Sequence, residues 1–219
     1  MSIIHHPGDD FLVAYAAGDL AQAWSLLIAT HIALCPACRS RTGDAEAIGG
    51  VFLSDEDPVE MSAGALDATL RRAMAMENDP APPPVVLSGG TLPVLPEPLR
   101  GCAGADIDGL RWRPLGRNAQ HIPLVSGQDG TVARLLRIPA GKPVPEHGHN
   151  GLELTMVLSG SFAANEMHFA RGDVETADAE IEHQPLAAPG DDCICLAVTD
   201  APLRFRGLFA RLVQPLIGI

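Results

Sequence analysis

GKPVPEHGHNGLELTMVLSG, residues 141–160, is the stretch from which the fold can be worked out. Side chains two residues apart in a β-strand face the same side, so His147 and His149 share one face. Glu153 joins them there if the Asn150-Gly151 segment keeps the register. Imidazoles and a carboxylate on one face predict a divalent metal site inside a β structure.

A fourth ligand is expected from a later strand. His183 stands in a segment that opens with Gly172-Asp173, and it would complete a set of three imidazoles and one carboxylate. This set suits Zn²⁺ or another divalent metal. His121 and His168 have no such context and are interpreted as ordinary surface or turn residues.

Residues 99–219 alternate short apolar segments with turn residues. The clearest candidate strands are Leu110–Leu115, Val132–Ile138, Leu152–Leu158, Ile194–Val198 and Leu203–Leu208. Such a pattern predicts an antiparallel β-barrel or jelly roll of about 120 residues.

Residues 79–98, DPAPPPVVLSGGTLPVLPEP, contain seven prolines and two glycines. This composition favours an extended chain and excludes a helix, so the segment is predicted to be a linker. It divides the chain into a first domain at 1–78 and a second at 99–219.

Residues 1–78 have helical periodicity and predict a small bundle of three or four helices. Asp19 is a candidate cap for the second helix, which is longer than the first. Gly43 and Gly49-Gly50 are expected to interrupt later helical stretches, and Ser62 to cap a last helix. A core of this size is marginal, and small domains often use a metal as a staple.

The segment HIALCPAC, residues 31–38, supplies a candidate metal site for this bundle. His31 and Cys35 lie four residues apart on one helix face, and Cys38 follows at the helix end. Two thiolates and one imidazole favour zinc, which needs a fourth ligand. We expect His6 to supply it, with His5 as the alternative. A thioredoxin-like Cys-x-x-Cys pair is disfavoured because it would follow a strand.

The charge of the chain limits the classes of molecule that it can bind. The net charge of −12 argues against direct nucleic-acid binding. Residues 1–79 carry 12 acidic and 4 basic side chains, which favours a basic protein partner.

No apolar stretch is long enough to span a membrane, and the N-terminus lacks the features of a signal peptide, so a cytoplasmic location is expected. Five cysteines in such a chain suggest metal binding or buried thiols.

The spacing G-x5-H-x-H-x3-E-x6-G in residues 141–160 matches the first cupin motif at every defined position. The second motif is weaker. It has Gly172-Asp173 and His183, but Ala177-Asp178-Ala179-Glu180 replaces the usual proline-glycine turn and Ala187 replaces an asparagine. The second domain therefore resembles a metal-binding cupin barrel.

The pattern H-x3-C-x2-C, with a histidine about 25 residues upstream, resembles the zinc-binding anti-sigma domain of bacterial regulators. Together with the linker and the cupin motif, it makes the chain similar to the ChrR-type anti-sigma factors. That resemblance implies that the N-terminal domain holds an extracytoplasmic-function (ECF) sigma factor. It also implies that the barrel is needed for release when singlet oxygen or a related oxidant is sensed, and that the protein is a regulator and not an enzyme.

Two other interpretations stay open. The barrel could belong to a metal-dependent enzyme of the dioxygenase or isomerase type with a helical regulatory domain, or to a sensor of metal levels. Cys193 and Cys195 lie on one face of a predicted strand, either as buried packing residues or as a redox-sensing pair.

Overall fold

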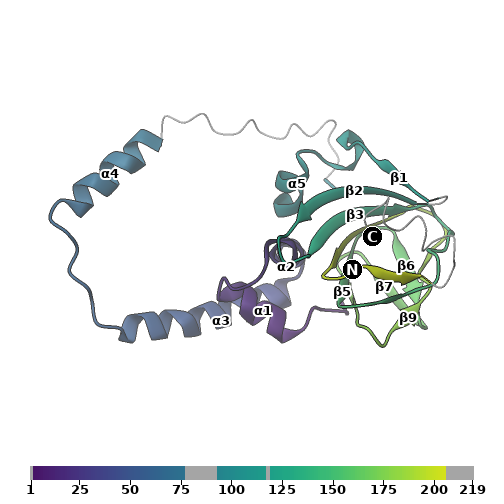
Figure 1. Ribbon diagram of the computed structural model, residues 1–219, viewed down its shortest axis with the longest axis horizontal. Coiled ribbons are helices and arrows are strands. Elements are labelled where there is room, and N and C mark those ends of the chain that lie inside the picture. The colour runs from purple at the N-terminus through teal and green to yellow at the C-terminus, as the bar shows by residue number, and fades with distance from the viewer. Residues whose placement is uncertain (1, 77–92, 117–118, 206–219) are drawn as a thin grey trace.

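The computed structural model describes residues 2–76, 93–116 and 119–205 (Figure 1). Its helices are α1 (Asp9–Ala16), α2 (Gln22–Leu34), α3 (Pro36–Asp55), α4 (Ala65–Met76) and α5 (Glu97–Ala103), followed by the 3₁₀ turn η1 (Ile107–Gly109). The strands are β1 (Arg113–Leu115), β2 (Ala119–Ser126), β3 (Val132–Ile138), β4 (His147–His149), β5 (Glu153–Ser159), β6 (Ser161–Ala164), β7 (Met167–Ala170), β8 (Val174–Ala177), β9 (Glu182–His183), β10 (Leu186–Ala187), β11 (Cys193–Thr199) and β12 (Leu203–Phe205). The predicted order of helices followed by an antiparallel β structure is confirmed.

The strands form three antiparallel sheets. The largest has the order β1-β2-β3-β11-β5-β8, and the two smaller ones have the orders β10-β6-β7 and β12-β4-β9. Side chains of β3, β5 and β11 pack with those of β6, β7 and β10 in a second core cluster that includes Val157, Phe162 and Phe169. This cluster fills the interior of the barrel.

The central strands of the large sheet are covered on both faces. Every residue of β5 and β11 except the last is buried, and most of their side chains are apolar. On the outer face, α2 packs against β2, β3 and β11. Leu27 of α2 belongs to the same core cluster as Leu154 and Leu196 of the sheet. The helices and the barrel therefore share one apolar core.

Two expectations about the helices are wrong. Gly43 and Gly49-Gly50 do not interrupt helical structure, because α3 runs through all three of them. A glycine costs about 1 kcal/mol in a helix interior, which weakens a helix without ending it. Asp19 does not cap α2, whose N-cap is Ala21, with no side-chain cap. None of the helices among the described residues is long and apolar enough to cross a membrane.

The last residues of the predicted linker are helical. Helix α5 begins at Glu97, although a helix was excluded there, and Pro98 occupies its first turn. Proline is tolerated in a first turn because its missing N–H has no intrahelical partner there. Leu95 and Leu99 are fully buried, and α5 packs on α2. Residues 79–92 of the predicted linker and 206–208 of the last predicted strand lie outside the described residues.

The shared core leads to a stability prediction. Leu27→Ala should lower the free energy of unfolding by about 2–5 kcal/mol, because Leu27 is fully buried. The loss should appear at one midpoint in a urea titration followed by circular dichroism and by tryptophan fluorescence, since Trp24 is in α2 and Trp112 lies beside the sheet. Val13→Ala, at an exposed position, is the control. Two separate transitions, with only one displaced by the substitution, would contradict a common core.

Candidate metal centres

The first cluster forms where three segments of the helical region meet. His31 lies in the last turn of α2, Cys35 is the N-cap of α3, and Cys38 lies in the first turn of α3. His6 comes from the segment ahead of α1. One donor atom of each of these four side chains lies within 4.8 Å of the others, an arrangement that could hold a metal ion.

The distances in this cluster fit a tetrahedral ion. His6 Nδ1 lies 3.3 Å from Cys38 Sγ and 3.5 Å from Cys35 Sγ. Metal–ligand bonds of zinc length at tetrahedral angles place a nitrogen and a sulfur about 3.5 Å apart. His31 Nδ1 donates to the carbonyl oxygen of Gly172 at 3.0 Å, so its Nε2 carries a lone pair. Among the residues that the structure describes, that buried Nε2 has no hydrogen-bond partner, and a cation would provide one.

Burial sets the protonation of these donors. It lowers the pKa of His31 to about 4, so the imidazole is neutral at pH 7, the form that binds metals. Burial and the neighbouring Cys35 raise the pKa of Cys38 to about 12. A bound cation would offset this cost by stabilising the thiolate.

The structure brings His6, and not His5, into the first cluster. The ring of His5 lies 4.6 Å from the ring of Phe169 on the barrel. Its backbone N–H donates to Asp173 Oδ1 at 3.0 Å, and its carbonyl accepts from the N–H of Val174 at 3.1 Å. His5 therefore attaches the N-terminal segment to β8 while the next residue turns toward the cysteines.

The second cluster lies in the small sheet β12-β4-β9. His147 and His149 are at the two ends of β4, and His147 is the register partner of His183 in β9. His183 Nε2 lies 3.1 Å from His147 Nε2 and 3.3 Å from His149 Nε2. All three rings are buried. These three side chains also have donor atoms within 4.8 Å of one another.

Two rings of this cluster direct their Nδ1 hydrogen at an acceptor, which turns their Nε2 atoms toward the other rings. His147 Nδ1 donates to the carbonyl of Pro145 at 2.8 Å, and His183 Nδ1 donates to Glu175 Oε1 at 3.0 Å. Their Nε2 atoms therefore face each other as lone pairs, which cannot form a hydrogen bond between neutral rings. A tetrahedral ion separates two such nitrogens by about 3.3 Å, close to the observed values. Burial also lowers the pKa of His149 to about 4.

Glu153 is the one predicted ligand that the structure leaves outside the group. Its Oε2 lies 3.9 Å from His149 Nδ1, and its Oε1 accepts from the hydroxyl of Thr155 at 2.9 Å. It is buried at the start of β5, so its carboxylate lies beside the three rings without joining them.

Sequence reasoning missed Glu175 of β8. This carboxylate is buried and accepts from the ring of His183. Burial alone would lower the pKa of His183, but the hydrogen bond and charge of Glu175 outweigh it and raise that pKa. Metal-binding histidines usually have such an acceptor on the second ring nitrogen. That rule calls for a carboxylate or carbonyl near His183 without indicating which one.

Cys193 and Cys195 lie in the barrel core. Both are buried on β11, and their sulfur atoms are 3.5 Å apart. The hydrogen bond with Cys193 and burial raise the pKa of Cys195 well above its ordinary value. These thiols pack as uncharged groups against residues such as Val157 and Phe162.

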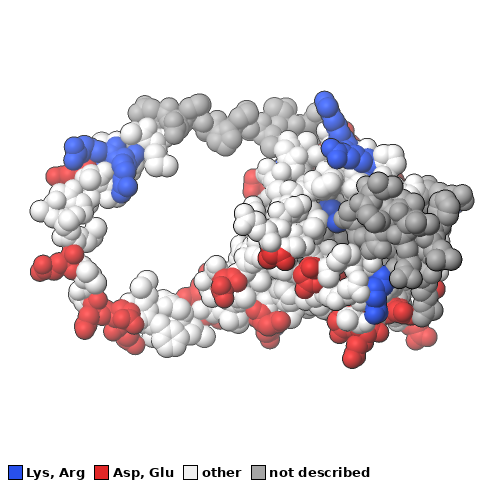
Figure 2. Space-filling view, in the orientation of Figure 1, with Lys and Arg blue, Asp and Glu red and all other residues white. Residues whose placement is uncertain are grey.

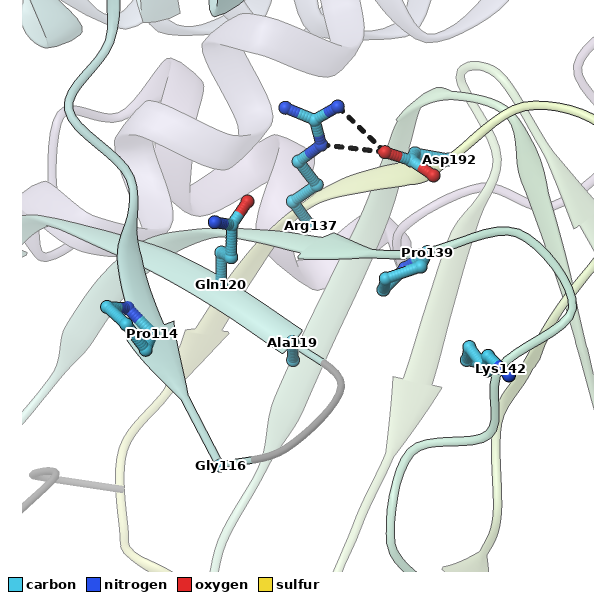
Figure 3. A pocket seen from close by; sticks show the side chains of 8 residues that line it. All are labelled: Pro114, Gly116, Ala119, Gln120, Arg137, Pro139, Lys142 and Asp192. Carbon is cyan, nitrogen blue, oxygen red and sulfur yellow. Dashed lines mark hydrogen bonds and ion pairs between the residues drawn. The ribbon is translucent and has the colours of Figure 1, made fainter.

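A surface hollow of about 470 Å³ lies away from both clusters (Figure 3). Arg137 forms a two-nitrogen contact with Asp192 at its rim, at 2.8 Å for each nitrogen. Lys142, Gln120 and backbone near Pro114 complete the lining, and no residue of either histidine cluster takes part. The hollow is therefore not the mouth of a metal centre.

The two clusters predict two metal ions per chain. Cys38→Ser should remove the ion of the first cluster and leave the other, and His149→Ala should do the reverse. Metal content after gel filtration, measured by plasma mass spectrometry, checks this. Cys102→Ser, at an exposed cysteine outside both clusters, should keep both ions. Equal metal content in all three variants would contradict the assignment.

Comparisons with known proteins match both the barrel region and the chain as a whole. Residues 101–202 match the family described as the ChrR cupin-like domain. The anti-sigma-E factor ChrR of Cereibacter sphaeroides is 45% identical over 219 residues, which is the whole of both chains. A chain in the crystal structure of Rhodobacter sphaeroides SigE in complex with the anti-sigma ChrR is 42% identical. That match covers 90% of this chain and 100% of that one, with a TM-score of 0.77. Identity of this extent along the full length shows that the chain belongs to the ChrR family of anti-sigma factors.

Proposed function

We propose that this protein is a cytoplasmic regulator that binds and inhibits an ECF sigma factor through its N-terminal zinc domain, residues 1–78. We further propose that it releases the sigma factor when the cupin barrel, residues 99–219, senses singlet oxygen or a related oxidant. The observation that carries the proposal is the full-length similarity to an anti-sigma factor whose relative is found in complex with a sigma factor.

The apolar surface of α3 and α4 supports a protein partner. It consists of large apolar side chains of these helices and of the segment between them that are between 51% and 88% exposed: Ile48, Val51, Phe52, Leu53, Val59, Met61, Leu66, Leu70, Met74 and Met76. Helix α4 has no buried residue, and Leu66, Leu70 and Met74 recur at intervals of four along one face of it. Exposed apolar arrays of this size mark interaction sites. We assign this surface to the sigma factor.

The charge around this surface suits such a partner. Acidic side chains lie on α3 and in the segment after it: Asp44, Glu46, Asp55, Glu56, Asp57 and Glu60. Figure 2 shows Asp and Glu gathered along the lower rim of the molecule, over α1 and α3. Sigma factors present basic, DNA-binding surfaces, and complementary charge speeds association and favours the correct partner.

Zinc in the first cluster would set the direction of α3. Cys35 and Cys38 are in the cap and first turn of this helix, whereas His31 is fixed on α2. An ion held by all of them would lock the angle between α2 and α3, and so the position of the apolar surface. Structural zinc sites contribute about 10–16 kcal/mol of folding free energy in small peptides. Loss of the ion would therefore disorganise the surface that binds the sigma factor.

The barrel cluster is the proposed sensor. We assign it Zn²⁺ or another divalent metal held by His147, His149 and His183, with Glu153 as a nearby carboxylate. Oxidation of a ligand would change its donor strength and break the geometry of the site. The low exposure of the rings, at most 4%, favours a small diffusing oxidant over a larger substrate. For the same reason a sensor is favoured over the alternative of a metal-dependent cupin enzyme.

The apolar surface can be tested by a charge substitution. Leu70→Asp should weaken sigma-factor binding at least tenfold, about 1.4 kcal/mol, because it places a charge on a face that becomes buried. Isothermal calorimetry with the organism's ECF sigma factor measures the effect. Met167→Asp changes an apolar side chain of similar exposure on β7 and serves as the control. Equal affinity of the two variants would place the sigma factor elsewhere.

The separate roles of the two clusters, inhibition for the first and sensing for the second, can be tested in a transcription assay. Cys35→Ala should free the sigma factor without any stimulus, because the first cluster holds α3. His149→Ala should still inhibit transcription, but release by singlet oxygen from a photosensitiser should be blunted. If Cys35→Ala inhibited as well as the unaltered protein, the role assigned to zinc would be wrong.

A further inference from the structure

Three consecutive residues between β7 and β8 hold three separate parts of the chain. Arg171 donates from Nη1 to the carbonyl of Val94, at 2.8 Å, just ahead of α5. The carbonyl of Gly172 accepts from His31 of α2. Asp173 accepts from the N-terminal segment through Oδ1. We call Arg171-Gly172-Asp173 the junction turn.

Asp173 attaches the N-terminal segment through its side-chain carboxylate, and the next residue adds a backbone hydrogen bond. Its Oδ1 accepts from the N–H of Ile4 at 2.8 Å and of His5 at 3.0 Å, while its Oδ2 accepts from the N–H of Ala170 at 2.9 Å. The N–H of Val174 then donates to the carbonyl of His5. Figure 1 shows the segment ahead of α1 running to the side of the barrel. This attachment fixes the residue just before His6.

A glycine at position 172 lets the N-terminal segment lie close against the junction turn. Its φ is +94°, in the region that favours glycine, and a Cβ there would collide with the side chain of Ile3. Without a side chain, its carbonyl can reach the ring of His31 while the N-terminal segment lies against it. Two donors of the first cluster, on His6 and His31, thus depend on neighbouring residues of one turn.

The junction turn is also tied to the second cluster. Its backbone is fixed on β5, because Gly172 donates to Val157 at 2.8 Å and Val157 donates to Asp173 at 3.0 Å. Directly after it, β8 carries Glu175, which accepts from the ring of His183. Only Val174 separates Asp173 from Glu175. A shift of His183 therefore acts on the strand that begins at the turn.

We infer that the junction turn couples the two metal clusters, with Asp173 and Gly172 as positioning residues for His6 and His31. Rearrangement of the barrel cluster would move β8 and the turn, and so withdraw two ligands from the first cluster. This inference rests on both proposed metal sites but not on sigma-factor binding.

Cobalt-substituted full-length protein tests the positioning role. Of the side chains in the two clusters only Cys35 and Cys38 carry sulfur, so thiolate-to-cobalt absorption reports the first cluster alone. With excess chelator, this absorption should decay about 10–100-fold faster in Asp173→Ala than in the unaltered protein, because losing the support of a metal ligand typically lowers metal affinity by that factor. Asp178→Ala, which removes an exposed carboxylate that accepts only a local N–H, is the matched control.

A backbone variant guards against misfolding of Asp173→Ala. Ile4→Pro removes the N–H that donates to Asp173, at a position whose side chain is 66% exposed. It should also speed the decay, whereas Ser2→Pro should not. Decay within twofold of the unaltered rate in both Asp173→Ala and Ile4→Pro would overturn the positioning role. If the unaltered protein showed no thiolate–cobalt absorption, the proposed metal site itself would fail.

The coupling is tested by combining variants. His149→Ala should speed the decay of the thiolate–cobalt absorption in the otherwise unaltered chain, although His149 lies in the other cluster. In the Asp173→Ala background it should add less than twofold, because the connection is already broken. No effect of His149→Ala in the unaltered background, or equal effects in both backgrounds, would overturn the coupling.

Discussion

Lone pairs of buried ring nitrogens face one another in this protein, and only a shared cation or proton can hold them so close. The Nε2 atoms of His147 and His183 are 3.1 Å apart although each ring already donates from its other nitrogen. His31 is fixed in the same way, with Nδ1 donating and Nε2 unpartnered. In every case a barrel residue supplies the acceptor, whether Pro145, Glu175 or Gly172. The barrel therefore sets the tautomers at both clusters.

The dependence of both clusters on the barrel agrees with the way that α2 packs on the barrel. The outer face of the large sheet is covered by α2, the helix that carries His31, and the two bury their apolar side chains in one cluster. The barrel thus provides both the apolar support for α2 and the hydrogen-bond acceptor for its metal-facing histidine. By contrast, α4 has no buried residue and the apolar side chains in the second half of α3 are exposed. The anchored part of the helical region therefore includes the first half of α3, which contacts α1 and α2 and contains the buried Thr42.

Local periodicity was enough to predict much of both clusters. A spacing of two placed His147 and His149 on one β4 face, and a spacing of four placed His31 beside Cys35. The same rules placed Glu153 beside this cluster, where its Oε2 lies 3.9 Å from His149 Nδ1 and its Oε1 accepts from Thr155. The glycines of α3 led to a wrong prediction, since a helix capped at Cys35 continues through weak positions. Contacts between the helical region and the barrel could not be predicted at all. The partner of His31 is 141 residues away in sequence, and nothing in a single sequence indicates that pairing.

The free energies of a hydrogen bond and of a bound zinc ion indicate how a signal could pass from one cluster to the other. Shifting a two-state equilibrium from 1:99 to 99:1 takes about 5.5 kcal/mol. A single hydrogen bond to a charged group contributes about 1.5–3 kcal/mol, so losing one contact to Asp173 would not by itself release a tightly bound partner. A structural zinc ion, at about 10–16 kcal/mol, exceeds that threshold. The junction turn is therefore better suited to withdraw ligands from a metal ion than to supply the energy of release. A small displacement of the turn would then lead to loss of the ion, and the strength of the hydrogen bonds of Gly172 and Asp173 would set the displacement at which the ion is lost.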